Sequence, residues 1–430
     1  MKPADTQHAL VPKLQFPEFR GALGWNATVL GKLSEVVRGG SPRPIDGFLT
    51  TSADGLNWLK IGDVDKDAKF VTQTAEKVRP EARSKTRVVN PGDLILSNSM
   101  SFGRPYILEI TTCIHDGWIA ITSIIPKAER DFLYYQISAP SSQSYFTDNA
   151  AGSGVQNLNA DIIKALPICF PSIPEQQKIA ECLSSVDELI AAQARKRDAL
   201  KTHKKGLMQQ LFPREGETQP RLRFPEFQNA GEWVLKKLGT VCEIQRGKFS
   251  HRPRNDPKFF GGQYPFIQTG DVVKSGGGAV IASQSLNEEG LAVSKLFKPT
   301  IVLITIAANI GDTGLLQTEG CFTDSVVGLI PKKDVGPVFL ELIMRGQKEN
   351  LNKVATTGAQ KNINNEILRE VSVLLPSSAE QQRIADCLTR LDDLIAAQTQ
   401  TLEALKTHKQ GLMQQLFPNH SQSDICAIQF

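Results

Sequence analysis

The sequence predicts an α+β protein of two tandem domains, each followed by a long α-helix, with the two helices paired as an antiparallel coiled coil. Three observations give this fold class. A long helical segment occurs twice, a short lead-in precedes each domain, and the domains carry short apolar runs of strand type. Recurrence at a fixed interval indicates an internal repeat, from which a pseudo-twofold symmetry is expected.

The helical segment spans residues 175–213 and recurs at 380–418, with roughly two-thirds of the paired positions identical. Neither copy has an internal proline, and apolar residues alternate three and four apart, as at Ile179 and Leu183. This alternation predicts an apolar seam along a long helix. Both relative directions are open, and we favour the antiparallel one because it satisfies both seams. Polar seam residues such as Lys204 and Lys409 either fix the register or lie where the seam is solvated.

The repeat extends into the domains in divergent form, at an offset of about 208 residues. The matched features are Leu14 to Phe19 with Leu222 to Phe227, Trp25 with Trp233, Gly62-Asp63 with Gly270-Asp271, and Cys113 and Asp116 with Cys321 and Asp324. We therefore predict a lead-in over 1–19, a first domain over 20–171, a helix over 172–213, a second domain with its lead-in over 214–376, a helix over 377–418 and a tail over 419–430.

Composition limits the class of protein. The chain has 430 residues, of which 40% are hydrophobic, and a formal net charge of +4. The sequence holds no run near the roughly 18 to 20 apolar residues of a membrane span, and its first residues do not resemble a signal peptide. Seven cysteines are scattered, and Cys182 and Cys387 occupy equivalent helix positions, where burial is favoured over metal binding. A cytoplasmic protein that is not bound to a membrane is expected.

Motifs for catalysis are mostly absent. Gly247-Lys248 lacks the residues around it that a phosphate-binding loop needs, and the sequence contains neither a His-Glu-x-x-His nor a Gly-x-Ser-x-Gly pattern. Asp256 to Phe260 faintly resembles an amino-methyltransferase motif but lacks its second proline. The two Gly-Asp pairs are interpreted as turns after strands. We therefore predict no catalytic residue, no cofactor and no metal.

Basic and amide side chains crowd the loop-like segments of both domains. Arginine and lysine contact phosphates or guanine edges, and asparagine and glutamine pair with adenine. The alternative for the densest basic loop, Arg246 to Arg254, is a solvated surface, and the loops at Gln156 and Lys361 either contact DNA or pack the domain on the helix. The candidate DNA-binding residues are Arg38, Arg43, Lys60, Asn98, Arg104 and Gln156 in the first domain and Arg246, Lys248, Arg252, Gln268, Lys274, Asn309 and Lys361 in the second.

With these features assembled, the chain resembles the specificity (S) subunit of type I restriction–modification systems over nearly its whole length. The resemblance lies in the two lead-ins, the Gly-Asp turns and the paired segments that begin Glu-Gln-Gln at Glu175 and Glu380 and end Gly-Leu-Met-Gln-Gln-Leu-Phe. One departure is that Ile-Pro precedes the first Glu-Gln-Gln and Ser-Ala the second, which puts the local helix cap in doubt.

The resemblance implies two target recognition domains, each of which recognises one half of a bipartite, asymmetric site in double-stranded DNA. It also implies that the helices set the spacer length and bind two methyltransferase (M) subunits, with restriction (R) subunits in the full complex. The partner subunits would carry out the chemistry. The alternatives are a coiled-coil scaffold that binds proteins without DNA specificity, and a single-chain enzyme that recognises and modifies DNA.

Overall fold

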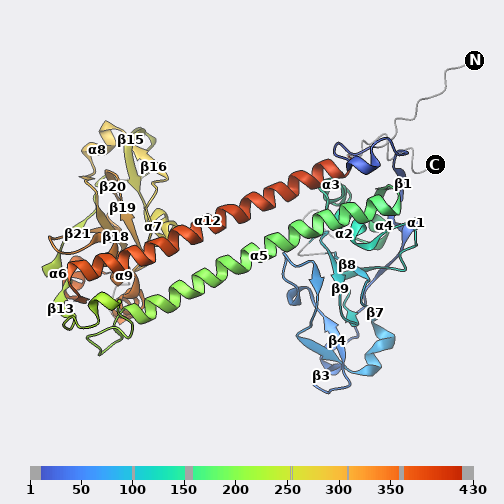
Figure 1. Cartoon of the computed structure of the whole chain (residues 1–430), viewed down its shortest axis with the longest axis horizontal. Helices are drawn as coiled ribbons and strands as arrows, with labels where there is room; N and C mark the ends of the chain where they lie inside the picture. Colours follow the sequence, from blue (N-terminus) through green and yellow to red (C-terminus); the bar gives the residue numbers. More distant parts are fainter. Residues whose placement is uncertain are drawn as a thin grey trace, which may run out of the picture. The chain divides into compact units, whose positions relative to one another are not determined.

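The computed structural model describes residues 11–98, 102–150, 158–251, 253, 255–307, 309–357 and 363–418. It divides into two compact units. Unit 1 comprises Met1–Arg195 with Thr399–Phe430, and unit 2 comprises Lys196–Gln398. The long helices α5 (Ile173–Leu211) and α12 (Ser378–Leu416) have 39 residues each and contribute to both units (Figure 1). The prediction of one long helix in each repeat is confirmed.

The described part of unit 1 contains three sheets. The first has the order β2 (Glu35–Arg38), β11 (Trp118–Thr122), β8 (Leu94–Ser97), β9 (Pro105–Leu108), β5 (Phe70–Val71). The second has the order β3 (Leu49–Thr50), β6 (Glu76–Val78), β4 (Leu56–Leu59), β10 (Thr112–Ile114), β7 (Arg87–Val89). The third pairs β1 (Asn26–Val29) with β12 (Pro167–Phe170). The helices are α1 (Leu30–Leu33), α2 (Arg130–Ser138), α3 (Pro140–Asn149) and α4 (Ala160–Lys164), with 3-10 turns η1 (Pro17–Phe19), η2 (Ile45–Gly47), η3 (Ile61–Asp63) and η4 (Pro80–Lys85).

Unit 2 has a corresponding set of sheets. The first has the order β14 (Cys242–Arg246), β21 (Val326–Pro331), β18 (Ile301–Thr305), β19 (Thr313–Leu316). The second has the order β16 (Gln284–Leu286), β15 (Phe260–Ile267), β20 (Gly320–Phe322), β17 (Leu296–Phe297), and the third pairs β13 (Val234–Lys237) with β22 (Ser372–Leu375). The helices are α6 (Leu238–Val241), α7 (Thr269–Ser275), α8 (Glu288–Ala292), α9 (Pro337–Gly346), α10 (Lys348–Thr357) and α11 (Asn365–Glu370), with turns η5 (Pro225–Phe227) and η6 (Pro257–Phe259).

The strands common to both domains share their order and register, whereas β3 and β5, the edge strands of the two larger sheets in unit 1, have no counterpart in the described sheets of unit 2. Ile95 of β8 lies opposite Ala120 of β11, and Leu303 of β18 lies opposite Gly328 of β21. Both residues of the second pair lie 208 positions after their counterparts in the first. The weak repeat seen in the sequence therefore corresponds to one sheet scaffold built twice.

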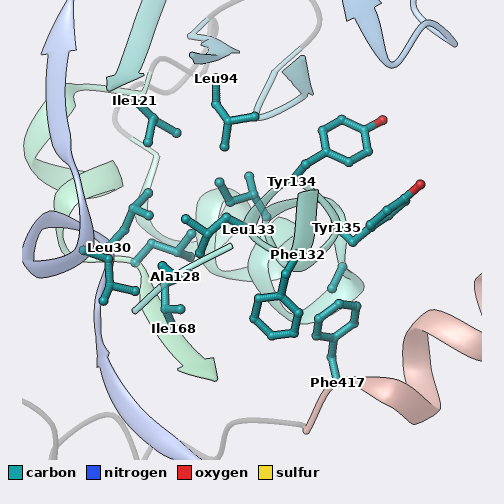
Figure 2. Packing of buried hydrophobic residues seen from close by; sticks show 14 of the residues in the cluster. Leu30, Leu94, Ile121, Ala128, Phe132, Leu133, Tyr134, Tyr135, Ile168 and Phe417 are labelled. Carbon is teal, nitrogen blue, oxygen red and sulfur yellow. The ribbon is translucent and has the colours of Figure 1, made fainter. Parts of the chain in front are cut away.

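The core of unit 1 forms around α2, whose buried residues pack against the first sheet, α5 and α12. Figure 2 shows Leu94 and Ile121 of the sheet on one side of α2 and Phe417 on the other. Glu129 caps this helix by accepting a hydrogen bond from the Phe132 N–H group, so α2 begins at Arg130, just before its run of buried residues. The Phe132 ring packs on Trp25 at 5.8 Å and on Phe417 at 5.4 Å between ring centroids. Phe417 directly follows α12, so the helix of the second repeat completes the core of the first domain.

Unit 2 repeats this arrangement with the roles of the helices exchanged. Phe339 of α9 packs on Trp233 at 5.7 Å and on Phe212 at 5.5 Å between ring centroids. Phe212 directly follows α5, the helix of the first repeat. Each domain core is thus completed by the end of the helix that belongs to the other repeat.

The Glu-Gln-Gln segments fix the start of each long helix. Gln176 accepts a hydrogen bond from the Glu129 N–H group at 2.8 Å and donates to the Lys127 carbonyl at 2.9 Å. Gln381 does the same with the Gly336 N–H group at 3.0 Å and the Asp334 carbonyl at 3.1 Å. Both glutamines are almost fully buried, so these bonds satisfy amides that would otherwise be costly to bury. The different residues before the two Glu-Gln-Gln segments do not change this arrangement.

The lead-ins cover the opposite helix ends. The Leu14 N–H group donates to the Gln415 carbonyl at 2.9 Å, and the Leu222 N–H group donates to the Gln210 carbonyl at 3.0 Å. The last carbonyls of a helix have no partner inside it, so each lead-in supplies one of the missing donors. Among the described residues, no helix is long and apolar enough to cross a membrane.

Phe417→Ala tests the closure of the first core. We expect it to lower the free energy of unfolding of unit 1 by about 3 kcal/mol, because a fully packed ring is replaced by a cavity. Urea unfolding followed by hydrogen exchange in α2 measures the change. Leu23→Ala, at a side chain that is 95% exposed, is the control and should shift stability by less than about 0.5 kcal/mol. A loss below about 1 kcal/mol for Phe417→Ala would contradict the packing role.

Candidate nucleic-acid interface

One parallel strand pair occurs at the equivalent place in both domains, and it brings two loops to the same sheet edge. In unit 1, Cys113 and Ile114 of β10 lie opposite Trp58 and Leu59 of β4. In unit 2, β20 pairs with β15 in the equivalent register. Because both strands of each pair end at one side, the residues that follow them lie together. We call these sites edge 1 (Lys60 with residues 115–117) and edge 2 (Gln268 with residues 323–325).

The first loop of each edge is held by an aspartate. The Asp63 carboxylate accepts the Lys60 N–H group at 2.9 Å, and the Asp271 carboxylate accepts the Gln268 N–H group at 3.0 Å. The two Gly-Asp pairs follow strands as expected, but they lie in helical turns: Gly62-Asp63 belongs to η3, and Gly270-Asp271 belongs to the first turn of α7. Their carboxylates are used in shaping the backbone, which fixes where the side chains of Lys60 and Gln268 begin.

The second loop of each edge holds an arginine. Arg38, at the end of β2, donates from Nε to the Asp116 carbonyl at 3.0 Å. Arg246, at the end of β14, donates from Nε to the Asp324 carbonyl in the same way. Both side chains are exposed, and only Nε is used in this bond, so the outer guanidinium nitrogens lie at the edge as donors.

Edge 1 gathers three of the predicted residues around Asp116. Arg43, whose side chain is 82% exposed, lies 3.5 Å from the Asp116 carboxylate. The Ser41 hydroxyl donates to that carboxylate at 2.8 Å, and this hydrogen bond is the main reason that the pKa of Asp116 is lowered. Asn98 is only 2% exposed, and its side-chain amide donates to the Asp116 carbonyl at 2.9 Å. We therefore assign Asn98 to holding the turn instead of contacting DNA.

Lys60 belongs to edge 1 and has a partner of its own. Its ammonium group contacts the Glu76 carboxylate at 2.6 Å, and both side chains are about two-fifths exposed. This hydrogen bond raises the pKa of Lys60, so the amine stays charged at neutral pH. Glu76 belongs to β6, the neighbour of β4 in the sheet.

His115 is a residue of edge 1 that sequence reasoning missed. Its Nδ1 accepts the Gly117 N–H group at 2.7 Å, which leaves the proton of the neutral ring on Nε2. Burial lowers the pKa of His115 and outweighs the opposite effect of Asp116, so the ring is neutral at pH 7. The spacing of Cys113 and Asp116 marked this loop in the sequence but gave no signal for the residue between them.

Edge 2 brings Arg246, Lys248 and Gln268 together. Lys248 is exposed, and its backbone N–H group donates to the Phe322 carbonyl at 3.1 Å, just before the second loop of the edge. The Gln268 amide donates to the Gln284 side-chain oxygen at 2.5 Å. Gln284 belongs to β16, which pairs with β15 as β6 pairs with β4. The pair Gln268–Gln284 is therefore the structural counterpart of Lys60–Glu76.

The remaining predicted residues lie elsewhere. Arg104 lies 3.6 Å from Asp67. Lys274 is exposed on α7, and Asn309 is exposed between β18 and β19. Gln156, Arg252 and Lys361 fall outside the described residues. Within the described part of the chain, no group of three or more His, Cys, Asp or Glu side chains could hold a metal ion.

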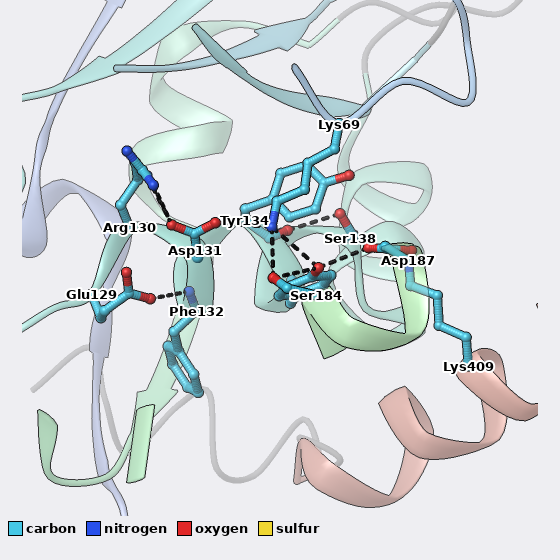
Figure 3. A network of polar contacts seen from close by, with 11 residues as sticks. Lys69, Glu129, Arg130, Asp131, Phe132, Tyr134, Ser138, Ser184, Asp187 and Lys409 are labelled. Carbon is cyan, nitrogen blue, oxygen red and sulfur yellow. Dashed lines mark hydrogen bonds and ion pairs between the residues drawn. The ribbon is translucent and has the colours of Figure 1, made fainter. Parts of the chain in front are cut away.

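A charged network attaches the domain of unit 1 to the helices (Figure 3). Lys69 lies 2.9 Å from the Asp131 carboxylate and donates to the Ser184 hydroxyl of α5 at 2.9 Å. The Tyr135 hydroxyl donates to Asp187 of α5 at 2.7 Å. Burial raises the pKa of Tyr135, which keeps this donor protonated. Lys409 of α12 completes the network 2.6 Å from the same Asp187 carboxylate.

Unit 2 contains the matching helix contact. Lys204 of α5 lies 2.5 Å from the carboxylate of Asp392 on α12. Lys204 and Lys409 are equivalent in the repeat, as are Asp187 and Asp392, and 17 positions separate aspartate from lysine in each helix. Within each unit the two helical segments run in opposite directions (Figure 1). The seam lysines therefore fix the register of one helix on the other in both units.

Both halves of the chain match one protein family. The sequence model of the type I restriction modification DNA specificity domain matches residues 24–202 and 230–407. The chain is 26% identical over 294 residues to the type I restriction enzyme MjaIX specificity subunit of Methanocaldococcus jannaschii, with 63% of each chain covered. It is 23% identical over 407 residues to the putative MjaX specificity subunit of that organism, with 90% of this chain and 92% of the relative covered. The first alignment spans less than two thirds of the relative.

Two solved structures share the fold. A chain described with the complex assembly and conformational transition of the type I R-M system covers 92% of this chain and 98% of its own length, with a TM-score of 0.59 and 20% identity. The S subunit of a type I restriction-modification system from M. genitalium covers 96% and 100%, with a TM-score of 0.58 and 15% identity. At these identities the likeness concerns the fold.

Tyr135→Phe tests the network of unit 1. We expect a loss of about 1 to 2 kcal/mol in the stability of unit 1, because the half-buried Asp187 carboxylate loses its hydroxyl donor and keeps only Lys409 among the described residues. Tyr134→Phe, at the neighbouring buried ring, is the matched control, since no hydrogen bond to its hydroxyl is found in the described part of the chain. Thermal unfolding of the three chains compares them. Equal stability of the Tyr135 variant and the control would show that the hydroxyl contributes nothing.

Proposed function

The chain belongs to the family of type I restriction modification DNA specificity domains, and on that premise we propose that it is the non-catalytic specificity subunit of a type I restriction–modification complex. Each domain recognises one half of a bipartite, asymmetric target in double-stranded DNA. The observation that carries this proposal is the pair of edges. They have the same backbone scaffold and an equivalent arginine, but different neighbouring side chains. A repeated scaffold with different exposed groups suits two different half-sites.

The domain limits of this proposal are those expected from the sequence. Residues 20–171 and 214–376 form the two target recognition domains, and residues 172–213 and 377–418 form the helices, which pair as an antiparallel coiled coil. The residues proposed to contact DNA are Arg38, Arg43, Lys60, Arg104 and Gln156 from the first domain and Arg246, Lys248, Arg252, Gln268, Lys274, Asn309 and Lys361 from the second. Arginines and lysines among them contact phosphates or guanine, and the amides contact adenine.

Edges 1 and 2 are each suited to DNA by charge and by exposure. Arg38 and Arg43 project from edge 1, and Arg246 and Lys248 project from edge 2. Cations at a fixed backbone position bind the phosphates and set the orientation of a domain on the duplex. A protein scaffold without DNA specificity would give no reason for equivalent arginines anchored at equivalent loops.

The helices suit two copies of one partner. They are nearly identical to each other although the domains have diverged, so they present similar surfaces in the two repeats. In this proposal two methyltransferase subunits bind these surfaces and carry out the chemistry, restriction subunits join the full complex, and the assembly acts in the cytoplasm. The chain itself contributes recognition and spacing, and it binds no cofactor.

Exchange of residues 20–171 for the corresponding domain of another family member tests the modular proposal. We expect only one half of the DNA target to change, because the edges belong to separate domains. Methylation mapping in a host that carries the chain with its methyltransferase subunit gives both half-sites. The matched control exchanges residues 214–376 and should change only the other half. A change of both halves in either exchange would contradict independent recognition.

Insertion of four residues into the middle of both α5 and α12 tests the spacing role. Four residues add about 6 Å and roughly one full helical turn, so the spacer should lengthen by about one or two base pairs while the half-sites stay the same. Insertion into α5 alone is the comparison. This insertion lengthens the separation between Asp187 and Lys204 on α5 but not that between Asp392 and Lys409 on α12. The two ion pairs between the helices then cannot both form, so we expect the insertion to lower the stability of the chain. An unchanged spacer with the double insertion, measured by the same mapping, would refute the spacing role.

A further inference from the structure

The two edges differ most clearly at one pair of side chains. Lys60 contacts Glu76 at 2.6 Å in unit 1, and Gln268 contacts Gln284 at 2.5 Å in unit 2. Both members of the second pair lie 208 positions after their counterparts, and the strand registers match as well, because Trp58 lies opposite Glu76 as Phe266 lies opposite Gln284. The same place in the fold therefore holds a charged pair in one domain and an amide pair in the other.

The backbone anchors around the pair are the same in both domains. Asp63 and Asp271 hold the loop on which the first member lies, and Arg38 and Arg246 are anchored on the next loop. Side chains that are identical in both domains cannot account for two different half-sites. The arginines Arg38 and Arg246 are therefore suited to phosphate contacts, which carry no sequence information. The pair that differs can distinguish the two half-sites.

The chemistry of each pair selects a different base pair. The Lys60 ammonium has three donors, of which Glu76 uses one, and guanine offers two acceptors, O6 and N7, in the major groove. The free Glu76 oxygen can accept from the amino group of the paired cytosine. After donating to Gln284, the Gln268 amide still has one N–H donor and its carbonyl oxygen as an acceptor. In the major groove, adenine accepts a hydrogen bond at N7 and donates one from its amino group, so both groups of Gln268 have a partner.

We propose that Lys60–Glu76 and Gln268–Gln284 are the equivalent specificity-determining pairs of the two domains, the first selecting a G·C pair in its half-site and the second an A·T pair. This inference rests on the proposed function and assigns the base recognition within it. Each pair is oriented before DNA binds, because the second member holds the side chain of the first. The members are exposed or half-exposed, so a base edge can reach them.

Reciprocal exchange of the pairs tests the inference. The variant K60Q/E76Q places the amide pair in unit 1, and Q268K/Q284E places the charged pair in unit 2. Each full-length chain, purified with its methyltransferase subunits, is used to select from a library of DNA duplexes randomised in both half-sites. We expect one position of the corresponding half-site to change from G·C to A·T in the first variant and from A·T to G·C in the second, by about tenfold in preference. The other half-site should stay the same.

Matched controls separate specificity from general effects. K32Q/E35Q makes the same chemical change at two exposed residues near the start of β2, away from edge 1, and should leave both half-sites unchanged. Arg38→Ala should weaken binding to all sequences alike and reduce its salt dependence, because a phosphate contact is lost. Circular dichroism establishes that each variant is folded, and the single substitutions K60Q and Q268K replace any double variant that is not.

The results that overturn the inference are distinct from those that overturn the proposed function. Unchanged half-sites in the exchanged pairs, or a uniform loss of binding like that of Arg38→Ala, would overturn the assignment of the pairs. If replacement of the whole domain over residues 20–171 also leaves the target unchanged, the proposed recognition role itself fails.

Discussion

The fold depends on an exchange of helix ends between the two repeats. Phe417 follows the second helix and packs on Phe132 of the first domain, and Phe212 follows the first helix and packs on Phe339 of the second domain. Burial of a large ring contributes several kcal/mol, so neither domain has a complete core without the helix of the other repeat. Each helix also begins in its own domain, where the buried Gln176 or Gln381 bonds the backbone. Every long helix is therefore tied at both of its ends.

This constraint explains why the helices are alike while the domains are not. Each helix must fit the start of one domain and the core of the other, and the contacts Asp187–Lys409 and Lys204–Asp392 require matching positions in both helices. The loops at edges 1 and 2 take no part in this packing, so their side chains are free to differ. Recognition of two independent half-sites requires helices that stay the same and edge side chains that can vary.

The sequence predicts the repeated parts of the fold well because repetition itself carries the signal. The two helices, the lead-ins and the Gly-Asp turns are visible as matched segments, and Cys113 and Cys321 mark equivalent strands. The candidate site could be predicted only in part. Arg38 and Arg246 stand out by residue type, but Asn98 has the same polar character and is buried as a backbone contact. Strand pairing between distant segments brings Glu76, Gln284 and His115 to the edges. No local sequence pattern indicates such pairing.

A cut in the chain tests the exchange of helix ends most directly. A protease site placed between Glu215 and Gly216, in the connection after α5, separates the two repeats covalently. After cleavage we expect the two fragments to migrate as one particle in size-exclusion chromatography and to unfold together, because the helix of each fragment completes the core of the other. Separation of the fragments under native conditions, each with its own folded domain, would contradict the account.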